Sequence, residues 1–490
     1  MARGALINFS GIAGRMVLLY VYTFILARML SVSDLGTYFL VFTIINLFGL
    51  AAMVGLDMGV VRFVSLYAGE GKFGKARQIV RYGLLFGLPV GITLTVMLFF
   101  AAPFINEHFL DNTAVSLTVM RVFALAIPFM VAARLFNATT QGMHRMQYQV
   151  YSRDIGEQGA KLFLSIVVLL LGAGILGVVC ANVAAVALAT AMALYFALKV
   201  LPSSGEAGSG GAAGSLLRYS LPLVFANILV ALWLQVDILM LGFMGTTEDV
   251  GFYGVALKLS LFGAKIISSF CIVFAPIISD LWNRDRATEL KELYVTVSRW
   301  IFISSLPIFL ALILFSDSLM NIFGSEFVTG SEALIILAIG QFLSAATGAA
   351  GMMVLMSGHS KLELLNVAVA LVVDVILCLL LIPGYGFMGA AIAHMVSMGV
   401  ANLMRIVEVW LFMHVFAYDR TFLKPVLSGV ASAIMVSVIG VFILTGAGIM
   451  QLLILASLLL FFYVLVIVIL GLEEQDRSLL RTIRAGMARS

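Results

Sequence analysis

The sequence predicts an all-α polytopic membrane protein of about 14 transmembrane helices, arranged as two six-helix lobes plus helices 13 and 14. Of the 490 residues, 62% are apolar and only 11% are charged, and the mean hydropathy is +1.12. Soluble domains are about half apolar and about a quarter charged. The apolar residues also gather into runs that reach the roughly 20 residues needed to cross a bilayer as a helix.

The predicted spans are apolar runs bounded by polar or charged residues. The first half has six, at about 10–30, 36–56, 78–101, 114–137, 154–172 and 175–199. The second half has six and then two more, at about 219–243, 250–276, 297–316, 331–356, 361–383, 387–413, 423–444 and 449–471. Two neighbouring pairs are separated only by Gly174 or by Pro383-Gly384, and each is counted as two helices.

Three short motifs recur in the same order in both halves, at an offset of about 215 residues. They pair Asp34–Tyr38 (DLGTY) with Asp249–Tyr253 (DVGFY), Gln141-Gly142 with Ser357-Gly358, and Gly174–Gly177 with Gly386–Gly389. One such match is weak, but three in order indicate an internal repeat. The chain is therefore expected to consist of two similar halves.

The charges in the connections predict the orientation. Seven alternate connections contain no Lys or Arg, and they hold Asp34, Glu107, Asp111, Glu248, Asp249, Asp317 and Glu326. The other connections and the tail hold most of the Lys and Arg, so the positive-inside rule places them in the cytoplasm. Both termini are then cytoplasmic.

The predicted domains follow from the spans and the repeat. They are an N-terminal lobe at 1–201, a cytoplasmic linker at 202–218, a C-terminal lobe at 219–415, helices 13 and 14 at 416–471, and a basic cytoplasmic tail at 472–490. The run SSGEAGSGGAAGS at 203–215 is typical of a flexible linker. Residues 281–296 and 473–490 mix apolar with basic residues, which is typical either of helices on the inner leaflet or of solvated basic helix ends.

Charged residues inside the spans are the candidate functional residues, because an ionisable group at membrane depth usually faces a cavity or a partner. The candidate substrate ligands are Lys258, Lys265, Arg15 and Arg121. Lys258 and Lys265 are about two helical turns apart and project from one face. Arg28 and Arg134 lie near helix ends, where they can instead snorkel to the interface.

The acidic residues inside the spans have several interpretations. Asp237 and Asp374 can balance the lysines when substrate is absent, can bind a proton or sodium ion that drives turnover, or can form a fixed ion pair between helices. The spacings of Glu157–Lys161 and Arg405–Glu408 predict local ion pairs.

No sequence feature points to an enzyme. Cys180, Cys271 and Cys378 all lie in apolar spans without disulfide or metal-ligand spacing, and are most simply core thiols. The sequence has no phosphate loop, metal cluster or nucleophile triad. No catalytic residue, metal, cofactor or nucleic-acid partner is expected.

Taken together, several features resemble the polysaccharide flippases of the multidrug/oligosaccharidyl-lipid/polysaccharide exporter superfamily. They are the fourteen spans in two halves, the Asp-x-Gly-x-Tyr turn after the first helix of each half, Asp237 ahead of the second turn, and the short connections. The resemblance covers about residues 5–471. It implies a bacterial inner-membrane protein that flips an undecaprenyl-diphosphate-linked oligosaccharide by alternating access through a cationic cavity. The implied partners are this glycan lipid, the bilayer and polysaccharide assembly machinery, with H⁺ or Na⁺ coupling as an option.

Two other classes remain as alternatives. A drug/cation antiporter of the same superfamily would need an acidic, aromatic cavity, whereas the mid-membrane charges here lean basic, and such exporters usually stop at twelve helices. A membrane glycosyltransferase or sugar polymerase would be expected to show a large outward loop with acidic catalytic residues. The longest predicted outward connection, 317–330, has only 14 residues.

Overall fold

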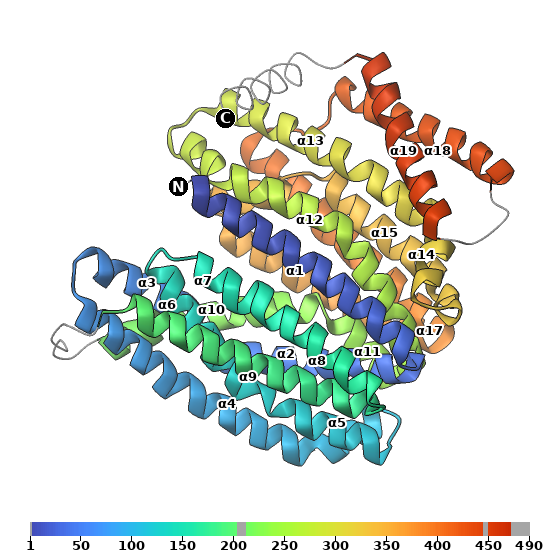
Figure 1. The fold of residues 1–490 in the computed structure, drawn as a ribbon. Coiled ribbons are helices and arrows are strands. Elements are labelled where there is room, and N and C mark those ends of the chain that lie inside the picture. The colour runs from blue at the N-terminus through green and yellow to red at the C-terminus, as the bar shows by residue number, and fades with distance from the viewer. Residues whose placement is uncertain (1, 203–211, 444–448, 472–490) are drawn as a thin grey trace. The chain divides into compact units, whose positions relative to one another are not determined.

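The chain is helical throughout the residues that the computed structural model describes, which are 2–202, 212–443 and 449–471 (Figure 1). One compact unit, Met1–Gly251, holds α1 (Ala2–Met29), α2 (Val32–Met53), α3 (Leu56–Gly69), α4 (Phe73–Phe109), α5 (Ala114–Ala124), α6 (Ala126–Gly142), α7 (Gln147–Gln149), the π-helix η1 (Val150–Glu157), α8 (Gln158–Leu170), α9 (Gly174–Val200), α10 (Ala212–Trp233) and α11 (Val236–Met244).

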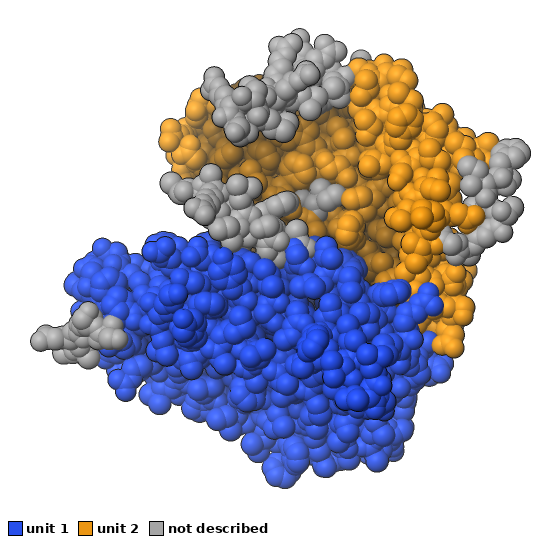
Figure 2. All heavy atoms as spheres, in the orientation of Figure 1, with its two compact units in different colours: residues 1–251 blue, residues 252–490 orange. Residues whose placement is uncertain are grey.

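The second unit, Phe252–Ser490, is coloured separately in Figure 2. It takes over α12 (Thr247–Asn283) after Gly251 and continues with α13 (Ala287–Leu314), α14 (Ser316–Phe323), the 3₁₀-helix η2 (Ser325–Gly330), α15 (Ser331–Ala346), α16 (Ala350–Met356), α17 (Ser360–Met413), the 3₁₀-helix η3 (Arg420–Phe422), α18 (Leu423–Ile443) and α19 (Ile449–Ile469).

These elements account for the predicted spans. Eleven helical segments among the described residues are long and apolar enough to cross a membrane. The longest, α17, is kinked at Gly386 (φ 52°, ψ −134°), so its 54 residues form two consecutive spans. The first and fifth predicted spans are occupied by α1 and by η1 with α8, which brings the number to about 14. The predicted fold class is confirmed.

The repeated Asp-x-Gly-x-Tyr motif begins a helix in each half. We expected it to form the turn before the span, but α2 begins at Val32 and α12 at Thr247, so the motif lies in the first turns of both helices. Ser31 Oγ accepts a hydrogen bond from Asp34 N, and Thr246 Oγ1 accepts one from Asp249 N, both at 3.1 Å. Each bond satisfies a backbone donor that the helix leaves free, and such a cap stabilises a helix by about 1 kcal/mol. The two caps are related by the same offset as the motifs.

Unit 1 is built around α6, which packs against α9, α3, α4 and α2. The second span does not end at Met53, because Val54 (φ 48°) and Gly55 (φ 65°) turn the chain and α3 continues from Leu56. The π-helix η1 packs against α1 and α9, and α8 packs against both as well. This packing places the charges of η1 and α8 beside α1.

In unit 2, the extra helices α18 and α19 pack on each other and on α13. Tyr463 OH donates to the carbonyl oxygen of Ile303 at 3.1 Å, and Tyr463 also packs with Phe302, Leu306 and Phe422 in one buried cluster. The last two predicted spans, which are α18 and α19, are therefore anchored to α13 by apolar burial and one hydrogen bond.

The boundary between the compact units differs from the predicted lobe boundary. Because α10 and α11 pack on α2 and α4, they belong to unit 1, and the division falls within α12. The lobes at 1–201 and 219–415 describe the repeat and stay a prediction. The tail at 472–490 and most of the linker at 203–215 lie outside the described residues.

Candidate substrate and ion sites

Charged residues line one side of the π-helical turn and the start of α8. Asp154, Glu157 and Lys161 follow each other at spacings of three and four residues, so they share a face. Gly156 lets this turn approach α9, because a Cβ there would lie 3.0 Å from Met192 Sδ on α9. Single π-helical turns in a helix often occur at functional sites.

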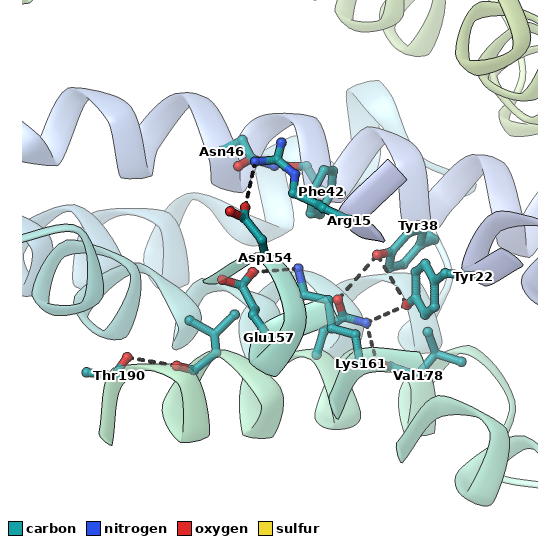
Figure 3. A network of polar contacts seen from close by, with 12 residues as sticks. Arg15, Tyr22, Tyr38, Phe42, Asn46, Asp154, Glu157, Lys161, Val178 and Thr190 are labelled. Atoms are coloured by element: carbon teal, nitrogen blue, oxygen red, sulfur yellow. Dashed lines mark hydrogen bonds and ion pairs between the residues drawn. The ribbon is translucent and has the colours of Figure 1, made fainter. Parts of the chain in front are cut away.

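Two ion pairs form on this face (Figure 3). Lys161 Nζ lies 3.0 Å from Glu157 Oε1 with side chains only 9% and 20% exposed, which confirms the predicted local pair. Lys161 also lies over the Phe42 ring, 5.6 Å from its centroid. Arg15 Nη1 lies 3.5 Å from Asp154 Oδ1, and here the arginine side chain is 41% exposed while the carboxylate is 6% exposed. Arg15 is thus held loosely, whereas Lys161 is enclosed.

Asp154 was not predicted as a partner of Arg15, because the two residues are far apart in sequence. The sequence did offer one indication, because Asp154 lies at the start of a predicted span. Arg15 was selected as a candidate for the same reason, namely a charged residue within a span.

Beside these ion pairs, three buried polar side chains form a closed ring of hydrogen bonds (Figure 3). Asn182 Nδ2 donates to Tyr22 OH at 2.7 Å, Tyr22 OH to Tyr38 OH at 3.3 Å, and Tyr38 OH to Asn182 Oδ1 at 3.3 Å. The ring joins α1, α2 and α9. Since Tyr38 ends the first copy of the repeat motif, the tyrosine of the motif has a packing role, and its counterpart Tyr253 is also fully buried.

The two predicted lysines lie on α12, in its unit 2 part. Lys258 is half-buried and Lys265 is exposed. A separation of seven residues puts them on one face of the helix. Arg15 and Arg121 belong to unit 1, so the predicted four-residue set is not assembled within one compact unit.

The other arginines in the spans differ in their surroundings. Arg121 lies over the Phe99 ring at 4.7 Å, and its buried Nε has no hydrogen-bond partner among the described residues. Arg28 is exposed and lies 5.8 Å from the Phe24 centroid, in keeping with snorkelling. Arg134 is only half-buried and has charged neighbours on other helices, namely Asp57, Arg153 and Glu157.

Both candidate acidic residues are completely buried. Asp237 begins α11, and its Oδ1 accepts the backbone N–H of Ile238 at 2.8 Å. Asp374 Oδ2 accepts Ser397 Oγ at 3.0 Å, and Cys378 Sγ lies 3.6 Å from Oδ1. A buried carboxylate needs such donors, because desolvation costs several kcal/mol.

The two segments of α17, before and after the kink at Gly386, are joined by three side-chain contacts. Glu363 pairs with Arg405 (Nε–Oε2 3.0 Å), Asn366 Nδ2 donates to Glu408 Oε2 at 2.8 Å, and Ser397 donates to Asp374. We expected Arg405 to pair with Glu408, its neighbour on the same helix. The kink at Gly386 folds the two segments against each other, so the bidentate partner of Arg405 is Glu363 instead.

Within the described residues, no group of three or more His, Cys, Asp and Glu side chains could hold a metal ion. The three cysteines, all within the described residues, form no disulfide. The prediction of core thiols holds for Cys378, which is buried, but Cys180 is exposed and Cys271 is intermediate.

Comparisons with known proteins point to one superfamily. Residues 1–282 match the family model described as "Polysaccharide biosynthesis protein", and residues 222–380 match the model "MatE". The "Probable low-salt glycan biosynthesis flippase Agl15" of Haloferax volcanii is 24% identical over 385 residues, which are 77% of each chain.

Solved structures share the fold at low sequence identity. "Lipid II flippase MurJ, inward closed conformation" has a TM-score of 0.73 at 14% identity, covering 95% of this chain and 98% of that one. An inward-facing multidrug resistance MATE family transporter has a TM-score of 0.72 at 16% identity, covering 81% and 94%.

Proposed function

The chain belongs to the polysaccharide biosynthesis protein family, and on that premise we propose that it flips an undecaprenyl-diphosphate-linked oligosaccharide to the outer leaflet of the bacterial inner membrane. Transport proceeds by alternating access between two lobes, with both termini in the cytoplasm. The glycan then passes to polysaccharide assembly machinery for lipopolysaccharide or exopolysaccharide. The match to a glycan biosynthesis flippase over 77% of the chain supports the substrate class.

The observation that carries the proposal is the lysine pair on α12. Lys265 is exposed and Lys258 is half-buried on the spanning helix α12, and the two lie on the same face. An ionisable side chain inside a membrane span commonly marks a substrate or ion pathway. Two lysines on one face of a helix can bind a diphosphate through charge-assisted hydrogen bonds.

Arg15 is the proposed third ligand, with Arg121 as a fourth. At 3.5 Å from Asp154 and 41% exposed, Arg15 can exchange its carboxylate partner for a phosphate oxygen. Its planar, always-charged fork suits phosphate recognition. Asp237 and Asp374 are the proposed sites of charge balance or of H⁺ or Na⁺ coupling.

A drug/cation antiporter is the second candidate function. It is favoured by the match of residues 222–380 to the MatE model. Such a protein would need an anionic binding surface, whereas the charged residues in the middle of α12, Lys258 and Lys265, are both basic.

Replacement of Lys265 tests the proposal. We expect Lys265→Ala to abolish surface-polymer export at an unchanged protein level, and Lys265→Arg to retain part of it because the charge survives. Lys291→Ala is the matched control, since Lys291 is an exposed lysine outside the spans. Full export by Lys265→Ala would reject Lys265 as a substrate ligand.

A further inference from the structure

The two copies of the Asp-x-Gly-x-Tyr motif touch each other through their glycines. A Cβ on Gly36 of α2 would lie 1.7 Å from the carbonyl oxygen of Thr247 and 2.8 Å from Gly251 N. A Cβ on Gly251 of α12 would lie 2.4 Å from the carbonyl oxygen of Val32. Only glycine permits this approach of two helix backbones, as in other close crossings of membrane helices.

The contact has the symmetry of the repeat. Val32 and Thr247 are related by the same 215-residue offset as Gly36 and Gly251. In each half, a backbone carbonyl oxygen and the glycine four residues later take part in the crossing. The carbonyl oxygen of each half faces the glycine of the other. This reciprocity is typical of two-fold related interfaces, in which one patch contacts its own equivalent.

A small set of hydrogen bonds fastens the same crossing. Asp111, in the connection between α4 and α5, accepts Thr247 Oγ1 at 2.7 and 2.8 Å and Ser33 Oγ at 2.9 Å. Ser33 Oγ and Thr247 Oγ1 are 2.8 Å apart. Thr247 is buried, but Ser33 is half-buried and Asp111 is exposed, so water can replace these bonds when the helices separate.

We propose that this crossing is the outer gate of the protein. It rests on the proposed alternating-access function and on the predicted topology, in which the connections holding Asp34, Asp111 and Asp249 face outward. The glycines allow tight closure, and the Asp111–Ser33–Thr247 cluster holds the closed state. Opening separates α2 from α12 at their first turns.

A cysteine pair tests whether the crossing must open. In Ser33→Cys/Thr247→Cys the two sulfur atoms replace hydroxyls that are 2.8 Å apart, which is close enough for a disulfide to form. A protease site inserted within 203–211 separates the halves on a gel unless the disulfide joins them, and each single cysteine variant is a control. Oxidation should lower glycan-lipid transport at least about tenfold, and reduction should restore it, because a locked gate blocks turnover. Unchanged transport by the cross-linked protein would overturn the proposal.

A labelling experiment tests the gate without any glycan. In a chain whose Cys180 and Cys271 are replaced by serine, a membrane-impermeant maleimide added outside should react slowly with Thr247→Cys, because the position is buried in the closed state. Gly36→Ala should accelerate labelling several-fold, since its Cβ forces the crossing apart. Gly159→Ala should not, because Gly159 is a helical glycine with nothing within 4 Å of its Cβ position.

The two experiments separate the gate from the transport activity. Accelerated labelling in a protein that moves no glycan lipid would support the gate and reject the proposed function. Absence of labelling, or equal labelling in the Gly36→Ala and Gly159→Ala backgrounds, would overturn the gate.

Discussion

At the scale of single residues, burial distinguishes the two ion pairs on the face formed by η1 and the start of α8. Lys161 and Glu157 are enclosed, whereas Arg15 keeps a large exposed fraction and a longer distance to its carboxylate. An enclosed pair is costly to break, because removing one partner leaves a buried charge unmatched. A loosely held cation is free to exchange partners. We therefore assign Lys161 a structural role and propose a binding role for Arg15.

This assignment predicts opposite phenotypes. Lys161→Met should destabilise the purified protein by about 3–5 kcal/mol, as expected for a broken buried pair, and the added change Glu157→Gln should recover much of the loss. Arg15→Ala combined with Asp154→Asn, which leaves no unmatched carboxylate, should keep the melting temperature close to that of Asp154→Asn alone while reducing transport. Thermal unfolding in detergent and a transport assay on the same preparations measure both. A stable Lys161→Met protein would contradict the structural role.

Asp237 offers a second prediction at this scale. Asp237→Asn keeps the oxygen that accepts Ile238 N–H but removes the charge. The variant should therefore fold and reach normal membrane levels, while turnover driven by a proton or sodium gradient falls. Turnover that keeps the wild-type gradient dependence would exclude Asp237 from coupling.

At the scale of helices, the repeat motif could be found from sequence but its structural role could not. The spacing of DLGTY and DVGFY showed an internal repeat, and hydropathy placed both motifs at the edge of a span. The helix caps are local, but the crossing glycines and the role of Tyr38 depend on contacts between residues more than a hundred positions apart. The partner of Arg405 was also mispredicted. The spacing of residues along one helix does not show that the two segments of α17 pack against each other after the kink at Gly386.

The kink in α17 makes a prediction at this scale. Gly386 has φ 52°, a conformation that side chains with a Cβ adopt only with strain, so Gly386→Ala should destabilise the protein by roughly 1 kcal/mol. Gly384→Ala is the matched control, because nothing lies within 4 Å of its Cβ position. Equal melting temperatures for the two variants would contradict a strained kink at Gly386.

At the scale of the whole molecule, composition and run length sufficed for the fold class, since burial in a bilayer imposes long apolar helices. The pairing of charges between helices was not predictable, because it requires the rotation of each helix about its axis. The four proposed ligands were selected by membrane depth, and the two lysines also by their helical spacing. The structure adds that the four are divided between two compact units.

The predicted orientation is tested by reporter fusions. Fusions at Ser209 and after Ser490 should report the cytoplasm, and a fusion within 317–330 should report the outside. An outside signal at Ser209 would overturn the span count and the assignment of the gate to the outer face.

Flipping of a glycan lipid by this protein can be measured directly with purified protein. Liposomes containing the protein and a fluorescent undecaprenyl-diphosphate oligosaccharide are treated with a membrane-impermeant quencher, which reports the fraction exposed in the outer leaflet over time. The proposed function predicts faster exchange between leaflets than in protein-free liposomes, and near-background exchange with Lys265→Ala. Background exchange with the wild-type protein, accompanied by uptake of a cationic drug, would contradict it.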